Sequence, residues 1–217
     1  MQSIVHYLSQ GSILLLIINL IFLQKAAKAT PPATVIKWFL LVSLLIQFIS
    51  SILSDNKINN LFLLHIYTLL EFLLLSLFYQ QRLTTDPRVH RYYLGGIILV
   101  SLLIIANSLW IEPLTTFNEN AKTLTHVFIL AQAVSYFFFH TETHRQRLTP
   151  LYNFFNAGVV LYYAGSFFIF MFSDFLVQQS VSTHRMFLVI NALLYALFQT
   201  FILVGLWRTL LHRRKSI

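Results

Sequence analysis

The chain has 217 residues, of which 57% are hydrophobic and only 10% are charged, and it contains no cysteine. A soluble domain usually carries about 25% charged residues, so this chain lacks the polar side chains needed to cover a water-facing surface. The composition also excludes disulfides and thiolate metal sites, and it leaves a formal net charge of +8 to be explained.

Seven apolar segments follow one another along the chain. Each is roughly 18 to 24 residues long, which is the length an α-helix needs to cross the hydrocarbon core of a bilayer. Because lipid offers no partner to backbone amides, helices are the only reasonable conformation for such segments. The sequence therefore predicts one all-α domain over 1–217, a single bundle of seven transmembrane helices at about 3–23, 36–54, 59–80, 92–110, 121–140, 151–173 and 186–208.

The basic residues are divided unevenly between the two sides of such a bundle. One side, formed by the loops after the first, third and fifth segments and the C-terminal tail, holds twelve: Lys25, Lys28, Lys37, Arg82, Arg88, Arg91, Arg145, Arg147, Arg208, Arg213, Arg214 and Lys215. The opposite side holds three: Lys57, Lys122 and Arg185. Lys and Arg concentrate in cytoplasmic loops, so the pattern predicts an N-terminus outside and a C-terminus in the cytoplasm. The net charge is thus an orientation signal, and we expect the lipid bilayer, not nucleic acid, as partner.

Glu71 is the one acidic residue inside a predicted span, near the centre of the third helix. A carboxylate at mid-bilayer is costly, so it should face the bundle interior and have partners, or be protonated. Tyr67 lies one turn before it and Asn60 continues the same face, while His65 and Thr68 run beside it. In the absence of a basic partner, we expect desolvation to keep Glu71 protonated at neutral pH.

Polar side chains recur at helical spacing in the other predicted helices. They are Ser43, Gln47 and Ser50 in the second helix, His126 and Gln132 in the fifth, Tyr163 in the sixth, and Asn191, Tyr195 and Gln199 in the seventh. Hydrogen bonds between helices would explain such stripes. A polar cavity or a proton-linked switch, centred on Glu71 and open to the outer face, would explain them as well. Both interpretations stay open at this stage.

The sequence contains little that resembles a metal or cofactor site. His140 and His144 are weak candidates for a shared zinc ion at the inner end of the fifth helix, but Glu142 points to the opposite side and cannot complete the site. Ordinary polar residues where a helix leaves the membrane explain these histidines better than a metal site does. The last helix has no lysine for a retinal Schiff base, so we expect neither retinal nor any other cofactor.

Two segments carry a family resemblance. They are Leu64-His65-Ile66-Tyr67-Thr68-Leu69-Leu70-Glu71-Phe72, preceded by Asn59 and Asn60, and the segment from Asn156 to Phe168 in the sixth helix. Together they resemble small uncharacterised seven-transmembrane-helix proteins of Bacteroidota, over nearly the whole chain. The resemblance implies a multi-pass protein of the bacterial inner membrane, and it implies that the Tyr67 and Glu71 face and the sixth helix belong to one shared design. It implies no activity or ligand.

Three classes of function fit this pattern. The first is a receptor-like sensor with an outward-facing polar cavity around Glu71, which would signal to a cytoplasmic partner such as a histidine kinase. The alternative is a proton-coupled small-solute transporter or channel. A second alternative is an intramembrane lipid hydrolase with a metal site, although the scattered histidines make an enzyme the less favoured interpretation. We therefore expect a sensor.

Overall fold

The computed structural model describes residues 2–26, 31–83, 86–143, 150–172, 175 and 181–214. Within these ranges the chain forms seven α-helices and one π-helical turn, and no strand. The elements are α1 (Gln2–Ala26), α2 (Pro31–Asp55), α3 (Leu61–Leu83), α4 (Pro87–Ala106), η1 (Asn107–Ile111), α5 (Glu119–Thr143), α6 (Pro150–Met171) and α8 (Val181–Arg214). The prediction of an all-α chain is confirmed.

Prolines mark the starts of three helices. α2, α4 and α6 begin at Pro31, Pro87 and Pro150, where the missing amide hydrogen costs nothing because the first amides of a helix have no intrahelical acceptor. At α4 the Asp86 side chain also accepts a hydrogen bond from the Arg88 amide at 2.7 Å. These starts precede the apolar runs by several residues in α2 and α4, because capping residues extend a helix beyond its lipid-facing part.

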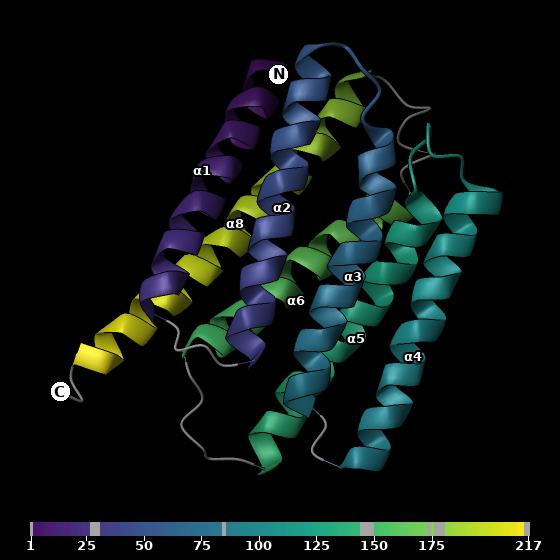
Figure 1. The fold of residues 1–217 in the computed structure, drawn as a ribbon. Coiled ribbons are helices and arrows are strands. Elements are labelled where there is room, and N and C mark those ends of the chain that lie inside the picture. Colours follow the sequence, from purple (N-terminus) through teal and green to yellow (C-terminus); the bar gives the residue numbers. More distant parts are fainter. Residues whose placement is uncertain are drawn as a thin grey trace.

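The helices lie side by side with alternating directions (Figure 1). Six of them pack in a closed order, α1 against α2, α2 against α3, α3 against α5, α5 against α6, α6 against α8, and α8 against α1. α4 stands outside this ring and packs mainly on α3, at the edge of the molecule. The ring therefore encloses an interior to which α4 contributes little.

Five helices are long and apolar enough to cross a bilayer. They are Pro32–Asp55, Leu61–Leu83, Pro87–Trp110, Pro150–Met171 and Arg185–His212. Within the part of the chain that the structure describes, α1 contributes a shorter apolar stretch, Gln10–Lys25, and α5 is not among the five. Five such helices make the chain a multi-pass membrane protein.

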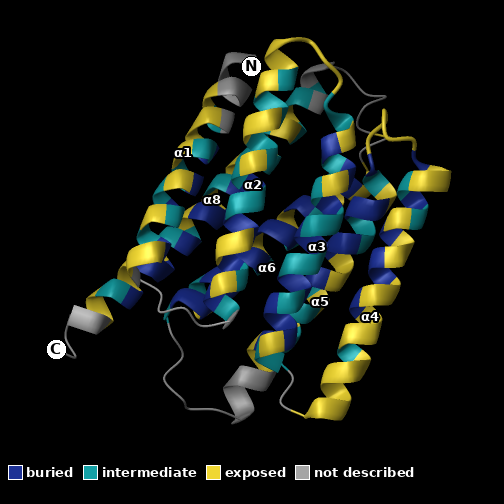
Figure 2. Ribbon diagram, viewed as in Figure 1, coloured by how far each residue is buried: buried dark blue, intermediate teal, exposed yellow. Residues whose placement is uncertain are grey.

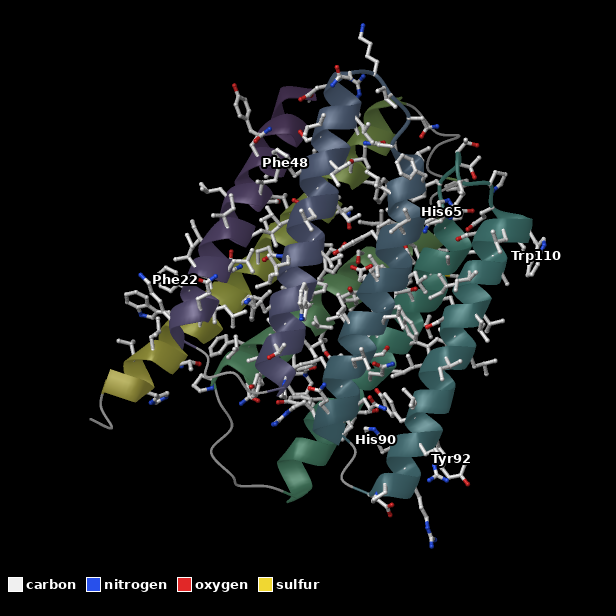
Figure 3. The ribbon with its side chains drawn as sticks, viewed as in Figure 1. Phe22, Phe48, His65, His90, Tyr92 and Trp110 are labelled. Atoms are coloured by element: carbon white, nitrogen blue, oxygen red, sulfur yellow. The ribbon has the colours of Figure 1, made fainter. Side chains whose placement is uncertain are left out.

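The outer surface of the bundle is apolar. Along α4 large side chains such as Ile98, Leu99 and Leu102 are exposed, and most of the helix is exposed in Figure 2 apart from the buried Ile97, Val100, Ser101 and Ile104. Tyr92 in α4 and Trp110 in η1, the turn that follows it, are 82% and 81% exposed and point away from the bundle (Figure 3). Contiguous apolar surface of this size is not tolerated in water, but it suits lipid, with aromatic rings at the two interfaces.

Aromatic side chains fill one half of the ring, which we call the aromatic half: Phe39, Phe78, Tyr79, Tyr136, Tyr152, Phe155 and Phe198, all buried. The ring centroids of Phe78 and Phe155 lie 4.9 Å apart in an edge-on contact. Tyr79 donates a hydrogen bond of 2.7 Å to Asn156, so its hydroxyl is satisfied inside this layer. The aromatic half thus has the dense packing of a closed core.

A close approach of α6 and α8 depends on Gly205. A Cβ atom placed there would lie 2.9 Å from Phe154 Cβ and 3.1 Å from the backbone Cα of Leu151. Backbone atoms of a packed helix cannot move aside cheaply, so the glycine is needed for the two helices to touch.

We expect Gly205→Ala to destabilise the protein by about 1–3 kcal/mol, because the added methyl overpacks the α6–α8 contact. Gly96→Ala is the matched control, since nothing lies within 4 Å of a Cβ at that position in α4. Thermal unfolding in detergent micelles measures both. Equal melting temperatures for the two variants would contradict the close approach.

Candidate functional site

Glu71 and Lys122 form a buried ion pair. Nζ of Lys122, in the first turns of α5, donates a hydrogen bond of 2.6 Å to Oε2 of Glu71 in α3, and the two side chains are 2% and 1% exposed. Either charge alone would be expensive in this position, and the pair offsets much of that cost. Glu71 therefore has a basic partner, so the condition under which we expected it to be protonated is not met. Lys122 lies at the N-terminal end of α5, where the sequence placed it, but its side chain points into the bundle towards Glu71.

Aromatic rings surround the Lys122 ammonium. Nζ lies 4.9 Å from the ring centroid of Tyr67 and 5.6 Å from that of Phe170, distances at which the ring faces attract a cation. An ammonium group has three N–H donors. One is used by Glu71, and the other two have no hydrogen-bond acceptor among the described residues.

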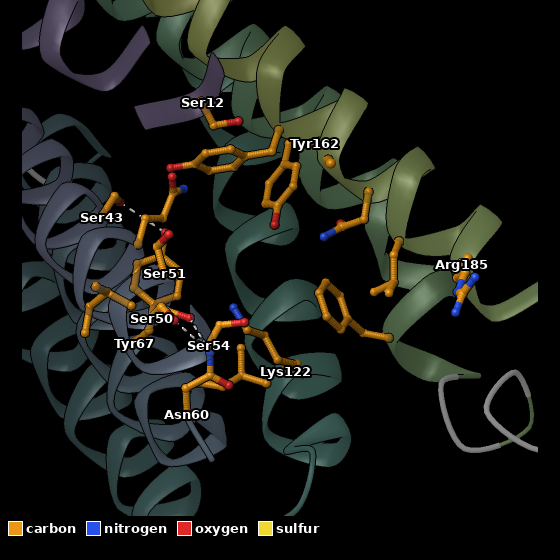
Figure 4. A pocket seen from close by; sticks show the side chains of 18 of the residues that line it. Ser12, Ser43, Ser50, Ser51, Ser54, Asn60, Tyr67, Lys122, Tyr162 and Arg185 are labelled. Atoms are coloured by element: carbon orange, nitrogen blue, oxygen red, sulfur yellow. Dashed lines mark hydrogen bonds between the residues drawn. The ribbon is translucent and has the colours of Figure 1, made fainter. Parts of the chain in front are cut away.

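Lys122 also lines a cavity of about 670 Å³ inside the ring (Figure 4). The cavity occupies the half that the aromatic side chains leave open, which we call the cavity half, from Ser43 and Tyr195 at its base to Asp55 and Arg185 at its rim. α2 and α8 supply most of its wall, and the serines of α2 give it hydroxyl groups. Its volume lies within the range of small-molecule binding sites.

Some polar groups on the cavity wall satisfy one another. Ser43 Oγ and the Tyr67 hydroxyl share a hydrogen bond of 3.1 Å, and the Asn60 amide donates to Ser50 Oγ at 2.7 Å. These bonds join α2 to α3 and to the residue just before it. These bonds hold polar side chains of the wall in place between the two helices.

Other polar groups on the wall have no partner. Oε1 of Gln47, Oδ1 of Asn191 and the hydroxyl of Tyr195 are buried and make no hydrogen bond to the residues that the structure describes. Buried polar atoms are nearly always hydrogen-bonded in folded proteins. A polar molecule in the cavity would supply the missing partners.

The predicted site residues lie in three environments: on the cavity wall, beside the Lys122–Glu71 pair, and at hydrogen-bonded contacts between other elements. Gln47, Asn60, Tyr67, Asn191 and Tyr195 line the cavity. The structure therefore brings together residues from α2, α3, α8 and the loop before α3.

Glu71 itself stands behind Lys122 and is not on the cavity wall. The Tyr163 hydroxyl lies close to the Glu71 carboxylate without reaching hydrogen-bond geometry. The charged group on the cavity wall is therefore Lys122, where the sequence predicted Glu71. Glu71 binds Lys122 from the side away from the cavity, and Tyr163 lies next to Glu71.

His65 and Thr68 join α3 to the segment between α4 and α5. His65 contacts Ser108 Oγ at 2.9 Å and the Thr116 carbonyl at 3.2 Å, and its side chain lies between α3 and α4 in Figure 3. Thr68 Oγ1 accepts a hydrogen bond of 2.8 Å from Asn118. Because Asn118 directly precedes α5, these bonds fix the start of the helix that carries Lys122.

The remaining predicted residues make hydrogen bonds between helices. These bonds connect His126 of α5 to Ser166 of α6 at 3.0 Å, Gln132 of α5 to Ser76 of α3 at 3.1 Å, and Gln199 of α8 to Asn19 of α1 at 2.9 Å. None of these residues lines the cavity. For them the structure agrees with the interpretation of polar residues as interhelical contacts.

Sequence reasoning assigned Lys122 and Arg185 to the outer surface and missed their place on the cavity wall. For Lys122 a signal was present, because it is the only lysine or arginine within the predicted fifth segment, 121–140. A charge inside a predicted span usually faces the bundle and pairs with an opposite charge. Glu71, the one acidic residue inside a predicted span, was the candidate partner for Lys122.

The weak metal candidates are not in the described part of the structure, since His144 and the side chain of His140 lie outside it. Among the residues that are described, no group of three or more His, Asp or Glu side chains is arranged to hold a metal ion. Comparison with protein-family models, with curated proteins and with solved structures finds no match for this chain.

Replacing Lys122 alone should be far more damaging than removing both members of the pair. We expect Lys122→Met to cost about 3–5 kcal/mol, because it leaves the Glu71 carboxylate buried without a partner. The double variant Glu71→Gln, Lys122→Met should recover most of that loss. Unfolding in detergent micelles gives the coupling free energy from the double-mutant cycle.

Lys37→Met is the control for this substitution, since Lys37 is exposed on α2, and it should leave stability unchanged. Strictly additive losses at Glu71 and Lys122 would show that the two groups do not interact.

Proposed function

We propose that this protein is a receptor-like membrane protein that binds a small polar ligand in the cavity and transmits binding through α8 to the opposite face of the membrane. The observation that carries the proposal is the continuity of α8. Its N-terminal part supplies Arg185, Asn191 and Tyr195 to the cavity wall, and the same helix continues without a break to Arg214.

α8 is longer than a membrane crossing requires. Its 34 residues span about 51 Å at 1.5 Å per residue, against a hydrocarbon core of about 30 Å. Figure 1 shows its C-terminal end projecting beyond the neighbouring helices. Arg208 and His212 are exposed on that end, where a cytoplasmic partner such as a histidine kinase could contact them. The helix would then be both the wall of the site and its output.

The closed aromatic half favours a receptor over a transporter. A solute entering the cavity meets the packed rings of Phe39, Phe155 and Phe198, with Phe39 and Phe198 5.9 Å apart between centroids. A transporter would have to separate this layer in every cycle. A receptor needs only a shift of α8 against it, of the small size typical of helix movements in signalling.

The proposed topology is seven crossings with the N-terminus outside, in a bacterial inner membrane. α1 and α5 belong to the closed ring, between helices that are long and apolar enough to span, which supports counting them as crossings. The twelve-to-three division of Lys and Arg, counted above, supports the orientation. The resemblance to Bacteroidota membrane proteins supports the choice of membrane.

The absence of cysteine allows a clean test of the orientation. Lys57→Cys, in the exposed turn after α2, should react with a membrane-impermeant maleimide on intact spheroplasts. Arg91→Cys, exposed near the start of α4, should react only after lysis. Labelling in the reverse order would overturn the N-out topology.

Coupling between the cavity and the far end of α8 is testable with spin labels at Lys37→Cys and Leu211→Cys, both exposed positions. Glu71→Gln and Lys122→Met, added to the spin-labelled protein, remove both charges at the cavity wall without any ligand. They should shift or broaden the distance distribution between the labels. Gly96→Ala, in peripheral α4, is the control and should not. An unchanged distribution in the charge-pair variant would contradict transmission through α8.

A further inference from the structure

We propose that the ligand of this cavity is a small organic carboxylate that also carries hydrogen-bond donors, as hydroxy acids and amino acids do. The inference rests on the proposed receptor site, and it adds the chemical class of the molecule that would occupy it. Two features of the wall carry it: a buried ammonium with spare donors, and buried acceptors without partners.

Lys122 provides the anion-binding group. Its ammonium is almost completely buried, it lines the cavity, and two of its N–H donors have no acceptor in the described part of the chain. Glu71 holds it from behind through one oxygen. A ligand carboxylate on the cavity side would complete the hydrogen bonds of Lys122, and such charge-assisted bonds are about twice as strong as neutral ones.

The charges around the cavity favour an anion. Lys122 and Arg185 line it as cations, and Glu71 pairs with Lys122 from behind the wall. Asp55, the one acidic residue on the wall, is exposed at the rim, where water screens its charge. Arg185 lies at the same rim and is half-buried, so its charge is screened as well. The buried charge on the wall is therefore that of Lys122, whose N–H donors not used by Glu71 can bind a carboxylate.

The unpartnered acceptors exclude a simple inorganic anion as the best fit. The side-chain oxygens of Gln47 and Asn191 need hydrogen-bond donors. The buried Tyr195 hydroxyl, which lies near Ser43 and Tyr67 without reaching hydrogen-bond geometry, can take either role. A fully ionised inorganic anion or a plain carboxylate offers only acceptors. A hydroxyl or ammonium group next to the carboxylate would satisfy the amide oxygens while the carboxylate satisfies Lys122.

The rest of the wall suits a short carbon skeleton. Leu64, Phe170 and Leu188 place apolar surface between the polar groups, and the Tyr162 ring adds an aromatic face. A cavity of about 670 Å³ has room for such a molecule together with a few waters. The lining thus combines the apolar contacts and the few placed polar groups that specific small-molecule sites usually have.

The test uses the purified full-length protein in detergent micelles and follows its thermal unfolding. The probes are L-lactate, L-malate, glycine and L-glutamate at millimolar concentration, each paired with the amide in which every carboxylate has been converted to a carboxamide. We expect at least one carboxylate to raise the melting temperature in a saturable manner, because a ligand that binds only the folded state stabilises it. Its amide should bind at least tenfold more weakly.

Two variants localise the effect. Arg185→Gln should weaken binding of the stabilising carboxylate about tenfold, and Glu71→Gln with Lys122→Met should abolish it, while Arg91→Gln, exposed and remote on α4, should bind as the wild type does. Equal binding of the amide, undiminished binding by the charge-pair variant, or no shift with any of the carboxylates would each overturn the proposed ligand class. So would tighter binding of phosphoethanolamine, which would assign the site to lipid headgroups.

The two proposals fail separately. If α8 responds to removal of the ion pair but no carboxylate binds, only the ligand class is lost. If a carboxylate binds in the cavity but the label distance at the far end of α8 stays constant, the site stands and the receptor role is lost.

Discussion

The Lys122–Glu71 ion pair is the interaction on which the cavity half of this protein depends. A lysine in the first turn of α5 adds to the positive end of the helix dipole, and the carboxylate of Glu71 in the middle of α3 is almost completely buried. Each charge offsets part of the cost of burying the other, and the pair joins the neighbouring helices α3 and α5. The hydrogen bonds of His65 and Thr68 serve the same contact, because they fix the residues that lead into α5.

The interior of the ring is divided into two halves with different physical properties. In the aromatic half, rings such as Phe78 and Phe155 pack edge-on, and the Tyr79 hydroxyl is hydrogen-bonded to Asn156. In the cavity half, Gln47, Asn191 and Tyr195 carry buried polar atoms without a partner among the described residues, and a cavity lies between the helices. α8 passes through both halves, so a change in its contacts at the cavity bears directly on its packing against α6, where Gly205 allows a close approach.

The helices could be predicted from sequence because a bilayer imposes a length and an apolar composition on whatever crosses it. The predicted ends of the helices were less accurate than their number and order along the chain. α8 extends from Val181 to Arg214, whereas its apolar run suggested 186–208, because a helix continues into polar surroundings that hydropathy does not register. The pairing of Lys122 with Glu71 joins residues 51 positions apart, and no local periodicity encodes which helices become neighbours. The same holds for Gln132 and Gln199, which face the interior as predicted but contact α3 and α1, not the cavity.

The central claim is that Lys122, held by Glu71, presents its ammonium to a polar cavity. The most direct measurement is an experimental density map of the full chain in a lipid nanodisc, at a resolution that defines side chains. The account predicts continuous density for Lys122 pointing between α3 and α6 towards Glu71, with solvent or ligand density against its other side. A Lys122 side chain extended towards the headgroups, with Glu71 packed against Tyr163 alone, would contradict it.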